Sequence, residues 1–498
     1  MTLPRLDRAA LDELRAGDRL SVPAARTVDC SVGIVHLGLG AFSRAHQAVY
    51  TEDAMLAAGG AEWGICGVTQ RSADVHDRLA AQDGVYGVLT RGDGRATLRI
   101  VGVVREVLDG GAQTEALLDR LADPRIAVVT ATVTEKGYRR AAGGGLDTRD
   151  PEVRADLAGG ADLAGRPPVT VIGRLVRGLA RRAHADAGPL TVVCCDNLPS
   201  NGTAVQRLVH DFCDALPGAE GGPLAEWIRA SVTFPSSMVD RIVPTTTDDD
   251  RRDAAALSGR YDAGLVVAEP FSQWVVEDRF AGARPCWERA GVQLTDDVGP
   301  FEVMKLRLLN GVHSTLAYLG ALRGHRTIAE AVRDDELRAI AEAMIRQDLI
   351  PTVEPPDGVD LGGYGHQVLA RFADPALRHT CVQVAMDGTQ KLPQRLLSAV
   401  SESLAAGRHP RYATLGVAAW MAYVARGRDV KGRALPLDDP LAATLGDVRG
   451  RTDADGVVDA LLRLDAVFGP DLVDHTAWRR ELTVDVQTLL TGAVPTVP

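Results

Sequence analysis

Residues 32–46 read VGIVHLGLGAFSRAH, and this stretch decides the fold of the first half of the chain. Its first six residues have the apolar character of a buried strand, and two closely spaced glycines follow them. Beyond the glycines an amphipathic helix is expected to begin. Such a turn presents backbone N–H groups to a pyrophosphate without a Cβ in the way. The cofactor residues predicted in this stretch are Gly38, Gly40, Phe42 and Arg44.

The glycine pattern alone does not establish a cofactor site. The third glycine of the usual dinucleotide fingerprint would fall at position 43, which holds Ser43. An ordinary turn between a strand and a helix therefore stays open as an alternative.

A second segment bears on the choice of cofactor. The sequence WGICGVTQRSAD at 63–74 predicts a strand, with Asp74 just beyond its end. A carboxylate at that place can accept hydrogen bonds from the adenosine ribose and repels a 2′-phosphate, which favours NAD over NADP. Two alternatives stay open: Asp74 can simply cap the helix that follows, and Arg71 can pair with a 2′-phosphate.

Short apolar runs alternate with helix-like stretches over the first half of the chain. Further runs at 97–104, 125–133 and 190–197 give a set of strands separated by helices, which is typical of βαβ units and a mostly parallel sheet. The proline-containing segments at 232–244 and 265–280 are expected to be irregular strands that extend this sheet.

After about residue 290 the hydrophobic residues repeat with the period of an α-helix. The expected fold class is α/β, with a Rossmann-type N-terminal domain and a mainly α-helical C-terminal domain. We expect residues 1–287 to form the first domain and residues 288–498 the second.

Composition and charge exclude several classes of function. The 498 residues carry 55 Lys and Arg against 66 Asp and Glu, a net charge of −11, which gives no general attraction for nucleic acid or anionic lipid. No apolar run reaches the length of a membrane span, and the N-terminus lacks the apolar core of a signal peptide. Seven cysteines do not make a disulfide framework, so we expect a cytoplasmic protein with buried, reduced thiols at Cys194 and Cys195.

The segment EVMKLRLLNGVH at 302–313 holds the candidate catalytic residues. An α-helix, at about 100° per residue, places Lys305, Asn310 and His313 on one broad face among Leu, Met and Val side chains. Three polar side chains on an otherwise apolar helix cost free energy unless they line a cleft. Taken singly, each also has an ordinary structural explanation, as a solvated lysine, a capping asparagine or a histidine with a core partner.

Six blocks of the sequence resemble the polyol-specific long-chain dehydrogenases, the mannitol dehydrogenase family. They are GLGAFSRAHQAVYTEDAM at 38–55, CDNLPSNG at 195–202, FPSSMVDRIVP at 234–244, EPFSQWVVED at 269–278, the spacing of Lys305, Asn310 and His313, and AMDGTQKLPQR at 385–395. They occur in the family's order and cover most of the chain.

The resemblance implies zinc-independent hydride transfer between NAD and a secondary alcohol of an acyclic sugar alcohol or hexonate. It also implies that residues 1–287 form a Rossmann-type NAD-binding domain, that residues 288–498 form a helical substrate-binding and catalytic domain, and that the active site lies between them. The substrate pairs expected are mannitol with fructose, or mannonate with fructuronate; mannitol 1-phosphate and arabinitol are alternatives. A monomer or small homo-oligomer that binds a small-molecule substrate is expected.

The residue types fit this chemistry. Without a metal, Lys305 can take the hydroxyl proton if its pKa falls from about 10.4 toward neutrality. The side-chain amides of Asn310 and Asn197 can donate hydrogen bonds to the carbonyl oxygen, and Asn197 follows a predicted strand at the edge where parallel sheets bind ligands. By resemblance, His313 orients substrate hydroxyls and Asp240 contacts one of them.

Structural alternatives stay open for several of these residues. Asn197 precedes Leu-Pro and can be a turn residue, and Asp240 can form an ion pair with Arg241. Glu302 can relay the proton of Lys305 or simply pair with it.

One departure from the family pattern bears on the substrate. Some mannitol dehydrogenases have an arginine eight residues before the lysine of the D-G-[ST]-x-K block; here that lysine is Lys391 and the position holds Gln383. The stretch resembles the fructuronate reductase branch more closely. A hexonate carboxylate favours a nearby cation, and Lys391, Arg395 or Arg378 can serve. Lys391 and Gln383 are therefore our substrate-binding candidates.

Two other classes of function stay open. A dinucleotide-binding sensor or partner protein would keep the fold without turnover, although it would have no need of all four polar candidates. A zinc-dependent alcohol dehydrogenase needs three clustered metal ligands, and the eleven histidines are scattered along the sequence. We therefore expect no metal site.

Overall fold

The computed structural model describes residues 3–70, 73–92, 94–141, 143–160 and 166–494. The chain divides into two compact units, Met1–Val298 and Gly299–Pro498. The first contains both helices and strands, and the second is helical.

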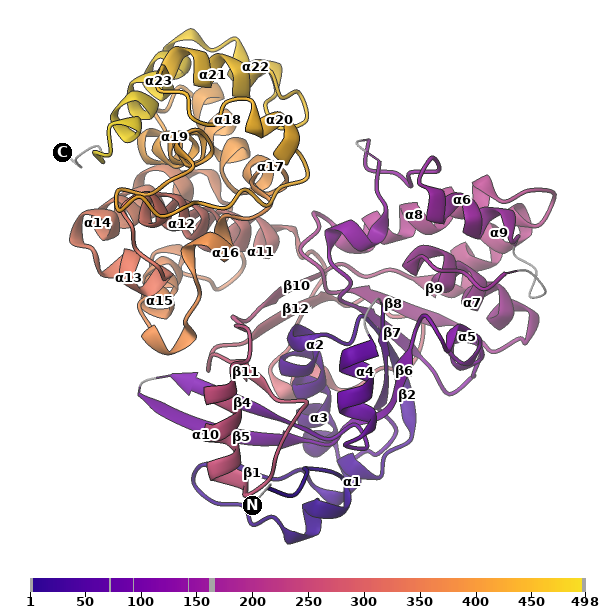
Figure 1. The fold of residues 1–498 in the computed structure, drawn as a ribbon. Helices are drawn as coiled ribbons and strands as arrows, with labels where there is room; N and C mark the ends of the chain where they lie inside the picture. The colour runs from indigo at the N-terminus through magenta and orange to yellow at the C-terminus, as the bar shows by residue number, and fades with distance from the viewer. Residues whose placement is uncertain (1–2, 71–72, 93, 142, 161–165, 495–498) are drawn as a thin grey trace. The chain divides into compact units, whose positions relative to one another are not determined.

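A six-stranded sheet forms the centre of the first unit, with strand order β6–β3–β2–β7–β8–β9 (Figure 1). All neighbouring pairs in this sheet are parallel. Strand β2 has β3 on one side and β7 on the other, so the strand order reverses here; open parallel sheets bind ligands at the carboxyl ends of strands at such a point. The strands are β2 (Val32–Leu37), β3 (Gly64–Thr69), β6 (Val104–Asp109), β7 (Val128–Ala131), β8 (Leu190–Cys194) and β9 (Val232–Thr233).

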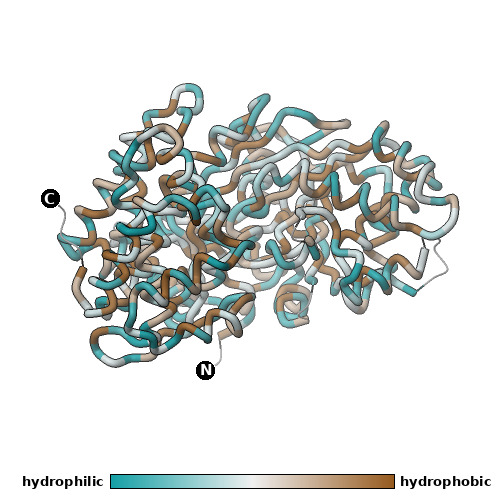
Figure 2. Tube along the Cα trace, turned by 90° about the horizontal axis from the view of Figure 1, so that it is seen from above, coloured by the Kyte–Doolittle hydropathy of each residue, from teal (hydrophilic) through white to brown (hydrophobic). Residues whose placement is uncertain are grey.

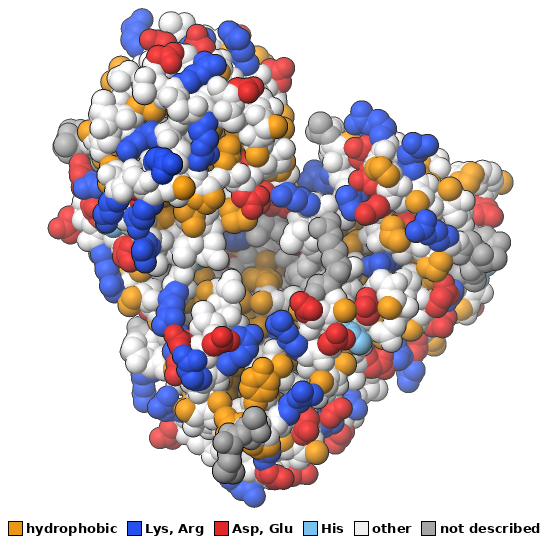
Figure 3. Space-filling view, viewed as in Figure 1, with side chains coloured by type: hydrophobic (Ala, Val, Ile, Leu, Met, Phe, Trp, Pro, Cys, Tyr) orange, Lys and Arg blue, Asp and Glu red, His pale blue; other side chains and the backbone are white. Residues whose placement is uncertain are grey.

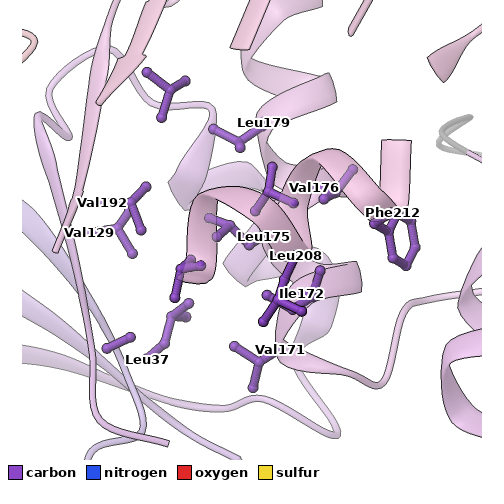
Figure 4. Packing of buried hydrophobic residues seen from close by; sticks show 14 of the residues in the cluster. Leu37, Val129, Val171, Ile172, Leu175, Val176, Leu179, Val192, Leu208 and Phe212 are labelled. Atoms are coloured by element: carbon purple, nitrogen blue, oxygen red, sulfur yellow. The ribbon is translucent and has the colours of Figure 1, made fainter. Parts of the chain in front are cut away.

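Alternating side chains of these strands enter two different cores. Leu37, Val129 and Val192 pack against apolar residues of α7 and α8, such as Leu175 and Leu208 (Figure 4). Their neighbours on the opposite face, among them Ile34, Val128 and Val193, pack with α3. The helices of this unit are α1 (Ala25–Val28), α2 (Ala41–Ala45), α3 (Gln47–Ala58), α4 (Ala73–Ala80), α5 (Thr114–Leu121), α6 (Pro151–Ala158), α7 (Val171–His184), α8 (Asn201–Ala215), α9 (Gly221–Ser231) and α10 (Asp248–Ser258), with 3₁₀ turns η1 (Ala9–Glu13), η2 (Glu135–Tyr138) and η3 (Trp287–Ala290).

Two smaller sheets complete the first unit, so the expected extension of the parallel sheet by residues 232–244 and 265–280 is wrong beyond β9. Pro235 and Pro270 lack the N–H that a central strand must donate, and the strands that follow them, β10 and β12, pair with each other in a separate sheet. The predicted run at 97–104 also divides, because β5 pairs antiparallel with β4 and β6 begins at Val104. The strands are β1 (Leu20–Ser21), β5 (Arg95–Val101), β4 (Tyr86–Gly92) and β11 (Val266–Ala268) in one sheet, and β10 (Ser237–Asp240), β12 (Gln273–Glu277) and β13 (Gln293–Thr295) in the other.

The first unit ends at Val298, later than the border expected near residue 287. Strand β13 pairs in parallel with β12. Trp287 is fully buried, with its ring centroid 4.6 Å from that of Trp274. These contacts hold residues 288–298 in the first unit.

The second unit consists of helices around two buried ones, and no strand occurs among its described residues. Every residue of α12 is buried, as is nearly all of α19, which is expected of helices that are apolar on all sides. Its helices are α11 (Gly299–Met304), α12 (Val312–Leu322), α13 (Ile328–Arg333), α14 (Asp335–Ala343), α15 (Leu361–Phe372), α16 (Cys381–Ala385), α17 (Gly388–Leu392), α18 (Ser398–Ala405), α19 (Arg411–Arg426), α20 (Ala442–Gly446), α21 (Ala454–Leu462), α22 (Pro470–Val473) and α23 (Thr476–Leu490), with π-helical segments η4 (Lys305–Gly311), η5 (Met344–Leu349) and η8 (Pro393–Leu397) and 3₁₀ turns η6 (Ile350–Thr352) and η7 (Pro375–Leu377).

Hydrophobic and hydrophilic stretches alternate closely along the chain (Figure 2). On the face shown in Figure 3, acidic and basic side chains are interspersed over the surface of each unit. Within the described ranges, no helix has both the length and the apolar character that crossing a bilayer requires. Cys194 and Cys195 are buried free thiols, and burial raises the pKa of both.

Candidate functional site

The glycine turn after β2 borders a cavity of about 480 Å³ that lies within the first unit. Gly38 has φ +93°, and a Cβ there would lie 2.2 Å from the carbonyl oxygen of Thr132, so no other residue fits. Gly40 is the residue before α2 and also lines the cavity. Helix α2 is only five residues long, so it offers little of a helix N-terminus to a ligand. The wall of the cavity, called the glycine cradle below, is the turn itself together with the ends of β3 and β7.

The side chain of His36 is connected to this turn through hydrogen bonds with two threonines, a role that the sequence analysis did not predict. Its Nδ1 lies 2.7 Å from Thr130 Oγ1 and its Nε2 lies 2.9 Å from Thr132 Oγ1. Thr132 Oγ1 in turn donates to the carbonyl of Gly38 at 3.0 Å. Burial lowers the pKa of His36 to about 4, so the ring is neutral near pH 7.

Phe42 and Arg44 are not among the described residues that line the cavity. Phe42 stacks on His46 with ring centroids 5.0 Å apart. The buried guanidinium of Arg44 donates to the carbonyl of Gly40 at 3.0 Å and to that of Gly264. Arg44 therefore fixes the glycine turn to a neighbouring loop.

At the end of β3, Gln70 lines the cavity and Asp74 does not. Asp74 lies exposed in the first turn of α4. Gln70 Oε1 accepts a 2.7 Å hydrogen bond from Arg174, a buried residue of α7 that lines the same cavity. Arg71, which the sequence offered as an alternative, lies outside the described residues.

The carboxylate of Asp196, the residue before Asn197, holds the backbone of Val133 and Thr134, which line the cavity. Asp196 accepts hydrogen bonds from the backbone N–H groups of Val133 and Thr134, both at 2.9 Å, and from the Tyr138 hydroxyl at 2.7 Å. Burial raises the pKa of Asp196. Asn197 itself has an exposed side chain shortly after β8.

Asp240 ends strand β10 with a buried side chain. The neighbouring Arg241 donates from Nε and Nη2 to the carbonyl of Glu269, at 3.1 and 2.9 Å. Arg241 thus fixes the backbone that follows β10.

In the second unit, the segment with Lys305 and Asn310 is a π-helix over Lys305–Gly311, where the sequence analysis assumed an α-helix. A π-helix bonds each residue to the fifth one along, so residues five apart lie one turn apart on the same side. The assumption of 100° per residue is therefore wrong for this segment. The side chains of Lys305 and Asn310 lie closer to the same side of the helix than an α-helix would place them. Both are buried, at 5% and 9% exposure.

The end of the π-helical segment packs closely against another part of the second unit. A Cβ on Gly311 would lie 2.6 Å from the carbonyl oxygen of Arg395, so the end of η4 touches another π-helical segment, η8. Arg395 also donates to Ser314 Oγ at 3.1 Å, one residue after His313. Pi-helical turns are frequent at functional sites.

His313 stacks on Phe372 at 4.5 Å between ring centroids and meets His379 edge-on at 4.9 Å. Burial lowers the pKa of His313 well below its ordinary value, and the neighbouring His379, Arg395, Lys391 and Arg371 lower it further. Two buried atoms, Nε2 of His313 and Oδ1 of Asn310, have no hydrogen-bond partner among the described residues. Such atoms are expected where a polar ligand binds.

The two substrate-binding candidates of the sequence differ in their surroundings. Lys391 Nζ donates to the carbonyl of Met386 at 2.5 Å and is one of the cations that act on His313. Gln383 is exposed and accepts hydrogen bonds from the N–H and hydroxyl of Thr380 at the start of α16. Its side chain caps that helix. Arg378, also exposed, follows η7 with a left-handed backbone.

No group of three or more His, Cys, Asp or Glu side chains in the described ranges is placed to hold a metal ion. The first unit thus contains a glycine turn that borders a cavity, and the second contains a buried Lys–Asn–His set. These features define a Rossmann-type dinucleotide-binding domain joined to a helical domain with a polar site.

Comparison with known proteins agrees with this class. The family model described as the mannitol dehydrogenase Rossmann domain matches residues 32–289, and that of the mannitol dehydrogenase C-terminal domain matches residues 297–490. The chain is 40% identical to the D-mannonate oxidoreductase of Escherichia coli (strain K12) over 464 residues, which cover 92% of this chain and 93% of that protein. It is 35% identical to a mannitol 2-dehydrogenase of Pyrenophora tritici-repentis, covering 94% and 82% of the two chains.

Among solved structures, mannitol 2-dehydrogenase of Pseudomonas fluorescens, in a ternary complex with NAD and D-mannitol, superposes with a TM-score of 0.88 at 35% identity. The match covers 97% of this chain and 96% of that one. The chain belongs to the mannitol dehydrogenase family, and it is an oxidoreductase.

Proposed function

We propose that this protein is an NAD-dependent dehydrogenase that interconverts D-mannonate and D-fructuronate, with Lys305 as the general base. The observation that carries the choice of substrate is the set of cations around His313. Arg371, Lys391 and Arg395 all act on this ring, as does the side chain of His379. A hexonate carboxylate can form ion pairs with these cations, whereas a neutral hexitol cannot.

The first unit offers a cradle that fits NAD. Gly38 has a positive φ and no Cβ, and its backbone borders the cavity. A pyrophosphate requires such close approach of backbone N–H groups. Gly40, Gln70 and Arg174 line the same cavity and would hold the cofactor there. When bound, NAD accepts a hydride from the carbinol carbon of the substrate.

The residues of the second unit then handle the proton and the oxygen. Lys305 is 5% exposed, and loss of solvation favours the neutral amine that a base needs. Its Nζ takes the hydroxyl proton as the alcohol becomes a ketone, and returns it in the reverse direction. Asn310 donates an amide N–H to the same oxygen, and its buried Oδ1 remains available to a substrate hydroxyl.

His313 contributes as a neutral ring. Because its pKa is held well below the ordinary value, it does not add a positive charge near Lys305 at pH 7. Its Nε2 has no partner among the described residues and is suited to orient a substrate hydroxyl. Asn197 is proposed as a second amide donor because of its place after β8, and Asp240 as a hydroxyl ligand because of the family resemblance. Substitution of each residue by alanine tests its role.

The experiment is a comparison of NADH-dependent reduction of D-fructuronate and D-fructose. We expect kcat/KM for fructuronate to exceed that for fructose by about 100-fold, since a charged hydrogen-bonded pair contributes about 1.5–3 kcal/mol. Lys391→Met and Arg371→Met should reduce this preference at least about tenfold. The matched control Arg408→Met removes an exposed guanidinium elsewhere in the second unit and should leave it unchanged.

Equal or better turnover of fructose would make the protein a mannitol 2-dehydrogenase, the activity named for its structural neighbour. Binding of NADH without reduction of either compound would indicate a non-catalytic dinucleotide-binding protein. Loss of activity in the two variants without a change in the substrate ratio would refute the assignment of the cations to a carboxylate.

A further inference from the structure

A second cavity of the first unit, of about 270 Å³, has basic side chains in its walls. Three arginines line it: Arg44 from α2, Arg78 from α4 and Arg251 from α10 (Figure 1). Two residues with hydroxyl groups, Thr245 and Thr246, line it as well and lie between β10 and α10. No Asp or Glu is among the described residues that line it. The walls of this arginine cavity therefore carry an excess of positive charge, which favours an anion.

Arg44 is a buried cation whose hydrogen bonds are incomplete. It is 7% exposed, and its Nε and Nη1 donate to the carbonyl groups of Gly40 and Gly264. Its Nη2 has no hydrogen-bond partner among the described residues. The nearby carboxylate of Asp262 accepts three hydrogen bonds from other N–H groups and forms no ion pair with Arg44. Since a buried charge without a paired counter-ion costs free energy, an anion in the cavity would stabilise this guanidinium.

The other two arginines leave this positive charge largely uncompensated. Burial lowers the pKa of Arg44, Asp262 raises it, and the neighbouring guanidinium of Arg78 lowers it again. Arg78 is exposed and forms no ion pair with a described residue. Arg251 pairs with Asp248 at 3.5 Å, and the Asp248 side chain is 90% exposed, so this surface pair contributes little. Like charges that line one cavity repel one another, and a multivalent anion between them removes this cost.

We propose that the arginine cavity binds a phosphoryl group, either free phosphate or the phosphate of a small phosphorylated metabolite. Guanidinium groups bind phosphate oxygens through charge-assisted hydrogen bonds. Thr246 Oγ1 donates to the carbonyl of Leu265 at 3.1 Å, so the hydroxyl that donates to the phosphate is that of Thr245. Since one water molecule takes up about 30 Å³ of liquid, the cavity has room for the phosphoryl group and part of the molecule that carries it. All of these residues belong to the first unit, so the site does not depend on the hexonate proposed as substrate.

Calorimetry with the protein saturated with NADH tests the proposal without turnover. Val75 lines both the arginine cavity and the cavity at the glycine cradle, and bound NADH keeps the probes out of the latter. The probes are glucose 6-phosphate and inorganic phosphate, with glucose as the uncharged control. We expect at least one phosphate probe to bind with a Kd below about 1 mM, and glucose to bind at least about tenfold more weakly. Equal affinity for the two phosphate probes supports a site for free phosphate, and tighter binding of glucose 6-phosphate supports one for a phosphorylated metabolite.

Substitutions then locate the bound phosphate. Arg78→Met and Arg251→Met should each weaken its binding at least about tenfold, because each removes a charge-assisted hydrogen bond. Arg229→Met removes an exposed guanidinium from α9 and serves as the matched control. Failure of both phosphate probes to bind the wild-type protein, or unchanged binding in both cavity variants, would overturn the proposal. Loss of binding in Lys391→Met, with the cavity variants unaffected, would place the phosphate among the cations of the second unit and would also contradict it.

Discussion

Asp196 Oδ1 accepts a 2.9 Å hydrogen bond from the backbone N–H of Thr134, a β-branched residue with φ +70°. This conformation is unfavourable for threonine, and strain of this kind costs about 1–3 kcal/mol. The same carboxylate binds the N–H of Val133 and the hydroxyl of Tyr138. Asp196 thus holds a strained turn that lines the cofactor cavity, immediately before the predicted amide donor Asn197.

Removing the charge of Asp196 is therefore expected to act on cofactor binding first. Asp196→Asn replaces one acceptor oxygen by a donor facing N–H groups, so the turn at Thr134 relaxes. We predict an increase of about tenfold in KM for NAD with a smaller change in kcat. Tyr138→Phe removes only one hydrogen bond and should raise KM by about threefold. A fall in kcat alone would show that Asp196 acts through Asn197 instead.

Gly38 provides a test of the cradle. In Gly38→Ala the new Cβ meets the carbonyl of Thr132, and the left-handed backbone adds about 1–2 kcal/mol of strain. We predict that the variant loses more than tenfold in NAD affinity by calorimetry. Gly188→Ala is the matched control, because Gly188 has φ +79° and open space around its Cβ position. If both variants bind NAD equally well, the turn is not the cofactor cradle.

Asn310 is predicted to act on the developing oxygen charge. Asn310→Ala should lower kcat by about 10²–10³-fold, the range found for loss of one such donor. Because Oδ1 of Asn310 is buried without a hydrogen-bond partner among the described residues, removing the side chain should not lower the melting temperature. The same substitution at Asn197 tests whether that residue is a second donor. A normal kcat in either variant would remove that residue from the catalytic set.

A buried carboxyl gives the second unit a specific pH dependence of stability. Asp348 accepts hydrogen bonds from the N–H groups of Tyr412 and Ala413 at the start of α19, at 2.6 and 2.8 Å. Burial raises its pKa from 3.8 to about 6. Ionisation above pH 6 therefore costs more in the folded than in the unfolded chain, and this cost disappears as the pH falls toward 4.

Asp348→Asn should therefore stabilise the protein by about 2–3 kcal/mol at pH 8, and the gain should vanish near pH 4. Urea unfolding of both proteins across this range measures the difference. The exposed Asp465→Asn serves as the control and should show no such trend. A variant that is less stable than the wild type at pH 8 would show that the ionised carboxylate is needed to cap α19.

The glycine turn and its neighbouring strands were predictable, because strand periodicity and adjacent glycines are local signals. The sequence did not predict which side chain after β3 lines the cavity. Asp74 and Gln70 are four residues apart, and the contact that fixes Gln70 comes from Arg174 on a helix distant in the sequence. The strand pairing in the two small sheets was not predicted either, because it depends on where prolines interrupt the chain.

For the candidate catalytic segment, too, only part of the structure could be predicted from the sequence. The residue types and spacing of Lys305, Asn310 and His313 were visible in the sequence. The π-helix that carries the first two was not predicted. Its end packs closely at Gly311 against Arg395, a contact between segments some 80 residues apart that periodicity does not reveal. The cations around His313 likewise come from α15, α17 and η8.

The central claim is that the amine of Lys305 takes the proton while the hydride leaves. The most direct measurement is the single-turnover rate of NADH formation by Lys305→Ala, with NAD affinity determined in parallel and methylamine added to replace the lost amine. We predict a rate lower by about 10²–10⁴-fold, unchanged NAD affinity and partial recovery with methylamine. A variant that keeps more than a tenth of the wild-type rate would contradict the claim.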